Sequence, residues 1–305
     1  MKIKFWGVRG SIPCPGPLTM KYGGNTACLE IRFSDIDRSI IIDAGSGIRE
    51  LGNFMMQHDL PKGPIRTEIF LSHTHWDHIM GFPFFTPIYI PGSKLTVYGP
   101  VSYEQDTLED IVGGQLTYRY FPVRGEELSA AITYIDLKEG QFDLGDGIRL
   151  TTKYLNHPIL CLGYRFEYRG KVLCTAYDTE PFRNLFITDP THPDYDEGMA
   201  MEGEQVAREQ NEVLDKFIAG ADLLIHDCQY SGAEYEADKK GWGHSYFEYV
   251  CPMAIRNNVK SLALFHHDPM RTDAQLDELC RIYCQGREKD GTEIFFAREG
   301  LEIIL

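Results

Sequence analysis

Residues 70–78 read Phe70-Leu71-Ser72-His73-Thr74-His75-Trp76-Asp77-His78. Three imidazoles and a carboxylate follow directly on an apolar segment that we expect to form a strand. In an extended segment alternate side chains lie on one side, so His73 and His75 should point together. Asp77 and His78 begin the next turn, which favours two adjacent groups of ligands over a single cage. Imidazole nitrogen and carboxylate oxygen suit zinc, manganese or iron.

The alternative is that these are ordinary polar residues near a turn. The chain has only ten histidines in 305 residues, so this dense grouping is not expected from composition. Burying three imidazoles without a partner or a metal ion would also be costly. We therefore interpret residues 73–78 as the centre of a metal site.

Other candidate ligands lie just past expected strand ends, where loops gather on one edge of a sheet. They are His157 after Leu150–Leu155, Asp178 after Lys171–Ala176, and His266 after Ser261–Phe265. Taken singly, each is better explained as a capping Asp or a half-exposed loop His than as a metal ligand. We favour His266 over the adjacent His267 because it comes first off the strand, and His267 remains the alternative.

Composition limits the range of functions. The 30 Lys and Arg against 45 Asp and Glu give a formal net charge of −15. Hydrophobic residues make up 43% of the chain and charged residues 25%, which excludes global disorder. The acidic balance makes a long nucleic acid an unexpected partner, because phosphate binding needs clustered Lys and Arg. A small anionic substrate held by metal ions remains compatible with it.

The sequence shows no sign of a membrane or secretory protein. Met1–Phe5 is not followed by an apolar signal region, and no run of 18 apolar residues occurs. The eight cysteines are scattered, without a C-x-x-C pair. These features predict a cytoplasmic protein with reduced thiols and no membrane partner.

The order of elements predicts an α/β fold. We expect a hairpin from Ala27–Phe33 and Ser39–Asp43, and helices at Glu202–Gly220 and Asp273–Cys284, the second capped by Thr272. A last hairpin is expected from Phe295–Phe296 and Glu302–Leu305. No Pro-, Gly- or Ser-rich linker divides the chain. We therefore expect one domain over residues 1–305, with sheet packed on sheet and helices outside.

The H-x-H-x-D-H segment and the other candidates together resemble the metallo-β-lactamase fold superfamily, over Phe5 to His267. The resemblance implies an αββα sandwich of two mixed β-sheets with helices on the outer faces. It implies a first metal ion on His73, His75 and His157, a second on Asp77, His78 and His266, and Asp178 bridging both. The implied cofactors are two divalent ions, Zn²⁺ or alternatively Mn²⁺ or Fe. Asp43 resembles a residue that orients the ligand loop.

Asp178 bears on the class of substrate. Superfamily members that cleave β-lactams usually carry Cys where this chain has Asp178, and an Asp there resembles hydrolases of phosphodiesters, lactones and thioesters.

Two further segments resemble the catalytic segments of ribonuclease Z, namely Leu224-Ile225-His226-Asp227 and Gly243-His244-Ser245. This implies that His226 protonates the leaving oxygen, tuned by Asp227 or His244. The alternative places His226 in a buried strand and His244 on an exposed loop.

The chain also departs from ribonuclease Z. It lacks a long Gly- and Pro-rich arm, and its opening segments 5–11 and 22–26 resemble a bacterial branch of uncharacterised hydrolases and cyclic-nucleotide phosphodiesterase-like proteins. Both segments contain glycine-rich turns, which we expect near the metal edge because glycine permits close backbone approach. Arg9 is expected either to meet a phosphate or to lie on the surface.

These observations predict a binuclear metal-dependent hydrolase. The leading hypothesis is a phosphodiesterase acting on a small (cyclic) nucleotide or a short RNA end, with a metal-bound hydroxide as nucleophile and Asp77 in the catalytic set. The alternatives are a lactone, ester or thioester hydrolase with the same site, and a catalytically weak metal-binding module. The resemblance also implies a homodimer.

Overall fold

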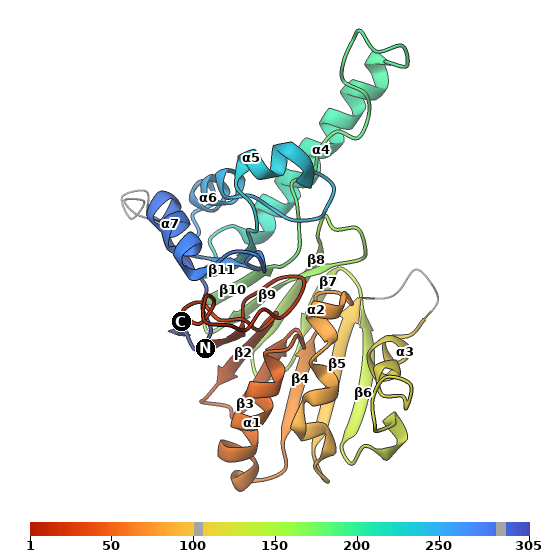
Figure 1. The fold of residues 1–305 in the computed structure, drawn as a ribbon, viewed down its shortest axis with the longest axis vertical. Helices are drawn as coiled ribbons and strands as arrows, with labels where there is room; N and C mark the ends of the chain where they lie inside the picture. Colours follow the sequence, from red (N-terminus) through yellow and green to blue (C-terminus); the bar gives the residue numbers. More distant parts are fainter. Residues whose placement is uncertain (101–105, 285–290) are drawn as a thin grey trace.

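The computed structural model describes residues 1–100, 106–284 and 291–305. Two β-sheets pack face to face, and helices cover their outer faces (Figure 1). Each sheet has seven strands among the described residues. This is the αββα sandwich of mixed sheets that the sequence predicts.

The first sheet brings parallel strands to one edge of the molecule. Its order is β14 (Glu302–Ile304), β1 (Lys2–Gly7), β2 (Cys28–Phe33), β3 (Arg38–Ile42), β4 (Arg66–Phe70), β5 (Lys94–Pro100) and β6 (Ala131–Leu137). The expected hairpin is present as β2 and β3, whereas β3 to β6 run parallel. Parallel strands end on the same side, so Asp43 and Ser72 leave the sheet together.

The second sheet brings the other candidate ligands to one edge. Its order is β13 (Glu293–Phe296), β12 (Ser261–Phe265), β11 (Leu223–Asp227), β10 (Lys171–Ala176), β9 (Leu162–Tyr168), β8 (Arg149–Tyr154) and β7 (Gly140–Asp143). Strands β10 to β13 are parallel, and β9 is antiparallel to both β8 and β10. His157, Asp178 and His266 therefore follow strand ends on one edge.

An apolar core between the sheets holds these edges together. Phe5, Phe70, Phe166 and Phe265 are each fully buried in it. The Phe70 ring meets the Phe166 ring edge-on, with centroids 5.6 Å apart. Burying a side chain of this size contributes about 1.5–3 kcal/mol, so the core outweighs the polar contacts in fixing the sheets.

Helices cover the outer faces. They are α1 (Ile48–His58), α2 (Trp76–Ile79), α3 (Leu108–Val112), α4 (Glu197–Ile218), α5 (Gly232–Glu234), α6 (Phe247–Arg256) and α7 (Asp273–Tyr283), with short 3₁₀ turns at Leu60–Lys62, Phe82–Phe84, Thr86–Tyr89, Gly113–Gln115 and Gly125–Glu127 and a π-helical turn at Tyr235–Lys239. Helices α1, α2 and α3 pack on the first sheet, and α4, α6 and α7 on the second. Thr272 caps α7 as expected, accepting a hydrogen bond from the backbone N–H of Gln275.

Two expected elements differ from the structure. Helix α4 begins at Glu197, because the Asp196 carboxylate caps it, and its first half projects from the body (Figure 1). The predicted last hairpin is wrong: β13 pairs with β12 in the second sheet, and β14 pairs with β1 in the first. Each short strand finds a partner distant in sequence, which local spacing does not reveal.

Among the described residues, no helix combines the length and the apolar character needed to cross a bilayer.

Candidate metal centre

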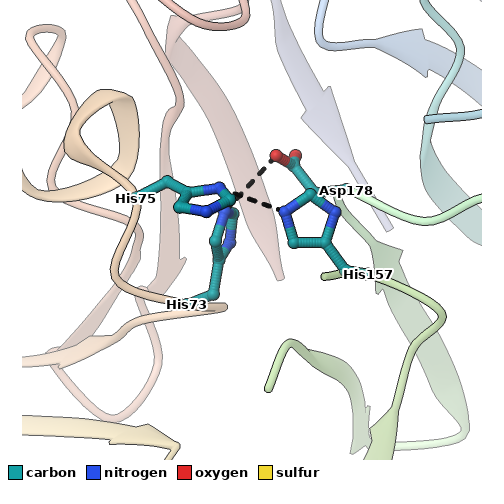
Figure 2. Close-up of side chains that lie close together, drawn as sticks. All are labelled: His73, His75, His157 and Asp178. Carbon is teal, nitrogen blue, oxygen red and sulfur yellow. Dashed lines mark hydrogen bonds and ion pairs between the residues drawn. The ribbon is translucent and has the colours of Figure 1, made fainter. Parts of the chain in front are cut away.

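Four side chains from three loops form the first ligand group, which we call the outer position. Its members are His73, His75, His157 and Asp178, and their ligand atoms all lie within 4.8 Å of one another. Figure 2 shows the imidazoles and the carboxylate converging on one point. His157 Nε2 lies 3.1 Å from His75 Nδ1, and His73 Nε2 lies 3.4 Å from Asp178 Oδ2. His75 and His157 are partly exposed, so this position opens to solvent.

The second group, the inner position, is entirely buried. Its members are Asp77, His78, Asp178 and His266, again within 4.8 Å of one another. His78 Nε2 lies 3.2 Å from Asp178 Oδ2, and His266 Nε2 lies 3.2 Å from Asp77 Oδ2. Asp178 belongs to both groups. The structure thus brings together all seven side chains that the sequence singles out as ligands.

Asp43 holds the inner position from behind. Its Oδ1 accepts a hydrogen bond from the Ser72 backbone N–H at 2.7 Å, and its Oδ2 accepts one from the Ser72 hydroxyl at 2.8 Å. His78 Nδ1 lies 2.7 Å from the same Oδ2. Donation from Nδ1 to Asp43 leaves the Nε2 lone pair of His78 facing the centre, as a metal ligand requires.

The backbone is strained where these residues lie. Asp43, Asp178 and His266 have φ values of 61°, 28° and 60°, in the left-handed region that residues with a Cβ rarely adopt. Such positions persist only where the surrounding structure holds them, and they cluster at functional sites.

The electrostatics of the group favour a cation. Burial lowers the pKa of His73 and His75 and lowers that of His157 to about 4, so these imidazoles stay neutral with free lone pairs. Burial also opposes the charged form of His78, but nearby carboxylates, Asp178 foremost, raise its pKa well above the usual range. The buried His73 Nε2 and Asp178 Oδ1 have no hydrogen-bond partner among the described residues. The donor set and these unpaired atoms fit divalent metal ions.

His244 and Asp227 form a pair at the rim of the centre. His244 Nδ1 lies 3.2 Å from Asp227 Oδ2, which also accepts from the Ser245 backbone N–H at 2.9 Å. The His244 ring stacks on that of His266 with centroids 4.9 Å apart. Burial lowers the pKa of His244, but Asp227 outweighs it and raises the value to about 9. A charged imidazole therefore adjoins the ligands.

His226 is not brought to the centre. Side chains alternate along β11, and His226 lies on the face of Leu224, which belongs to the helix-covered core. Its Nδ1 lies 2.6 Å from the carbonyl oxygen of Asp227, and its buried Nε2 has no hydrogen-bond partner among the described residues. The geometry therefore does not support His226 as proton donor, and His244 is the histidine in reach.

Of the two adjacent histidines, the structure favours His266. His267 points away and its Nε2 donates a hydrogen bond to the carbonyl oxygen of Ala297 at 2.7 Å. Burial lowers its pKa to about 3, and its ring meets that of Tyr22 edge-on. His267 is a buried structural residue.

Arg9 differs from both expectations for it. The side chain is fully buried, so it neither lies on the surface nor is open to a phosphate. The expectation for its neighbour Gly10 is confirmed, because a Cβ at Gly10 would lie 2.3 Å from the His266 ring. Sequence reasoning missed the backbone N–H of Ser11, which donates to Asp77 Oδ2 at 2.7 Å. No residue-type signal could have revealed it, because any residue except proline carries that donor.

Comparison with known proteins agrees with the fold. A family model described as a β-lactamase superfamily domain matches residues 38–189. Ribonuclease Z from Lactococcus lactis is 26% identical over 298 residues, covering 87% of this chain and 88% of the relative.

Solved structures share the architecture. The metallo-β-lactamase fold protein YhfI from Bacillus subtilis superposes with a TM-score of 0.63 at 19% identity, covering 99% of this chain and 98% of that one. The short form of human tRNase Z gives 0.61 at 19% identity, covering 100% and 99%. Unliganded yeast PDE1 gives 0.61 at 16% identity, also covering 100% and 99%.

The fold and the ligand edge define a class, the metal-dependent hydrolases built on an αββα sandwich. The chain has the metallo-β-lactamase fold, about half of it matches the model of the β-lactamase superfamily domain, and ribonuclease Z is among its relatives. At this level the sequence-based prediction is confirmed.

Proposed function

We propose that the protein is a binuclear phosphodiesterase acting on a small nucleotide or a short RNA end. The observation that carries the proposal is the membership of Asp178 in both ligand groups. A carboxylate shared by two complete groups is the arrangement that places two cations side by side. Ions held there would activate a water molecule and neutralise charge on a phosphodiester undergoing displacement.

The seven ligand side chains divide this work. His73, His75 and His157 supply neutral nitrogen to the outer position, where partial exposure admits a substrate. Asp77, His78 and His266 supply the buried inner position. The ligands suit Zn²⁺, with Mn²⁺ or Fe as alternatives.

We assign the proton donor to His244. Its imidazole lies against His266, and Asp227 both orients it and favours its charged form. A charged imidazole beside the site can protonate the departing oxygen, and general acid catalysis of this kind contributes about 10²–10⁴-fold. His226, in the outer core, does not contribute a proton in this proposal.

The proposed substrate rests on the similarity to ribonuclease Z and on the net charge of this chain. The relative from Lactococcus lactis is a ribonuclease Z, which by its name cleaves RNA. This chain carries a net charge of −15, which repels an extended polyanion. A short nucleotide substrate, neutralised locally by two cations, satisfies both observations.

Turnover of a substrate panel by the metal-loaded protein tests this proposal. We expect hydrolysis of bis-p-nitrophenyl phosphate and of cyclic nucleotides or a short RNA, with two ions per chain by elemental analysis. Preferred cleavage of a lactone or thioester panel would replace the phosphodiesterase by the alternative hydrolase. Metal without turnover of any ester would indicate a binding module.

A further inference from the structure

The opening segment Val8–Ser11 touches the inner position at two ligands, although it supplies none. Gly10 lies so close to His266 that a Cβ there would be 2.3 Å from Cε1 and 2.4 Å from Nδ1 of the ring. The Ser11 backbone N–H donates to Asp77 Oδ2 at 2.7 Å. His266 and Asp77 are the two inner ligands that lie farthest apart in sequence, so this segment ties them together.

The segment is paired with the backbone around His266. The His267 N–H donates to the carbonyl oxygen of Val8, and the Gly10 N–H donates to the carbonyl oxygen of His267, each at 3.0 Å. Both bonds are made by His267, and His266 directly before it has a φ of 60°, while Ser11 has a φ of 64°. Neither residue is glycine, so neighbouring contacts must hold both in the left-handed region.

The Arg9 side chain binds the turn that follows His266. Its side chain is fully buried and donates from Nε to the carbonyl oxygen of Gly23 at 2.8 Å. Its Nη1 donates to the carbonyl oxygens of Asp268 and Arg271 at 3.0 and 2.8 Å. The guanidinium thus closes the turn that follows His266 and joins it to the glycine turn at residue 23.

The chemistry explains why this residue is an arginine. A guanidinium offers five donors in one plane, so it can serve carbonyls from two directions at once. A lysine ammonium would reach fewer of these carbonyls. The Nε and Nη1 of Arg9 are matched by these carbonyls, whereas Nη2 has no hydrogen-bond partner among the described residues and lies 4.0 Å from Asp273 Oδ1. Loss of the guanidinium would remove the donor to three carbonyl oxygens at once, which makes Arg9 sensitive to substitution.

The outer position shares Asp178 with the inner one, but two of its imidazoles are held by groups outside residues 8–11. His73 is held by the Ser72 hydroxyl at 3.0 Å from its Nδ1, and His157 by the carbonyl oxygen of Gly243 at 3.0 Å. Neither contact involves residues 8–11. A disturbance at Arg9 should therefore reach the two positions unequally.

We propose that Arg9 is a positioning residue for the inner metal position, acting through the turn at His266 and through Ser11 on Asp77. This inference rests on the proposed binuclear centre. It assigns the opening segment a task in metal binding. It predicts that loss of Arg9 lowers affinity for one ion of the two.

The test measures zinc bound per chain by elemental analysis after equilibrium dialysis against buffered Zn²⁺. In Arg9→Lys and Arg9→Met we expect one ion to bind as in the unaltered protein and the other about 10–100-fold more weakly, the usual effect of losing a partner behind a ligand. Arg9→Lys keeps a buried cation and serves if Arg9→Met does not fold. Gly10→Ala, which pushes on the His266 ring directly, should weaken the same ion.

Arg32→Lys is the matched control, because Arg32 is also held by several bonds, to Asp59 and Glu30, but touches no ligand in the described structure. We expect a lower melting temperature with both zinc affinities unchanged. Equal weakening of both ions in the Arg9 variants, or unchanged binding of both, would overturn the proposal. An unaltered protein that binds a single ion would overturn the binuclear centre as well, so the two failures are distinguishable.

Discussion

The outer and inner positions share Asp178 but are built differently. Every inner ligand is buried, and Asp43, Ser11 and Gly10 support three of them from behind. The outer position exposes two of its imidazoles, and its ligands His73 and His157 are held by the Ser72 hydroxyl and the Gly243 carbonyl oxygen. Buried charge must be matched in advance, whereas exposed ligands can rely on solvent. The inner position is therefore part of the buried interior of the protein, whereas the outer one is open to solvent.

Removal of an outer ligand is expected to have the largest effect. In His75→Ala the outer position loses one of its three imidazoles, while the inner group stays intact. We expect about 10³-fold or greater loss of turnover, because one ion alone cannot clamp both the attacking and the leaving oxygen. Elemental analysis should still find one ion per chain.

His192→Ala is the control for this variant, since His192 is exposed on the segment before α4. It should leave turnover and metal content unchanged. If His75→Ala retained two ions and full turnover, the outer position would not be a metal site.

The adjacent residues His226 and Asp227 allow a second comparison, because Asp227 binds His244 beside the metal centre whereas His226 lies on the opposite face of β11. In His244→Asn we expect a loss of about 10²–10³-fold with substrates whose leaving group is a poor one, and only a small loss with p-nitrophenolate, which departs without a proton. His226→Asn should affect both substrates equally and slightly, through stability alone. Equal losses for both substrates in His244→Asn would remove it from the donor role.

Asp43→Asn weakens the support of the inner ligand His78 and leaves every ligand side chain unchanged. The amide keeps the shape of the carboxylate but can no longer accept at both atoms from Ser72 and His78. We expect about 10–100-fold weaker binding of one ion, with the other unchanged. Zinc titration against a competing chelator measures both affinities, and Asp146→Asn, at an exposed turn, is the control.

Metal removal gives the mildest test. Because the outer ligands are partly exposed and the inner ones buried, chelation of the loaded protein should release zinc in two phases, the outer ion first. A colorimetric zinc indicator follows both phases. A single phase releasing both ions together would mean that burial does not separate the two positions.

Much of the site was predictable because its residues follow strands. His73, His75, Asp77 and His78 lie together in sequence, and strands β8, β10 and β12, which run in one direction, bring His157, Asp178 and His266 to the same edge. The face on which a residue lies was harder to predict. His226 and Asp227 are adjacent and equally polar, and only the pairing of β11 in its sheet sends one to the helices and the other to the centre.

The aromatic residues after the motif show the same limit. Phe82 and Phe85 are fully buried in the core. Trp76 and Phe84 are 78% and 54% exposed. All four residues are aromatic, so residue type does not distinguish the buried positions from the exposed ones, and only packing does.

Local sequence patterns are enough to indicate the class of fold and the ligand chemistry, because periodic apolar segments and clustered imidazoles act over short distances along the chain. Tertiary structure alone decided the fate of Arg9, whose partners Asp268 and Arg271 lie more than 250 residues away. It also decided that β14 returns to pair with β1 beside the amino terminus (Figure 1). Such contacts arise only when folding brings distant segments together, since no local pattern encodes which carbonyl a buried guanidinium will meet.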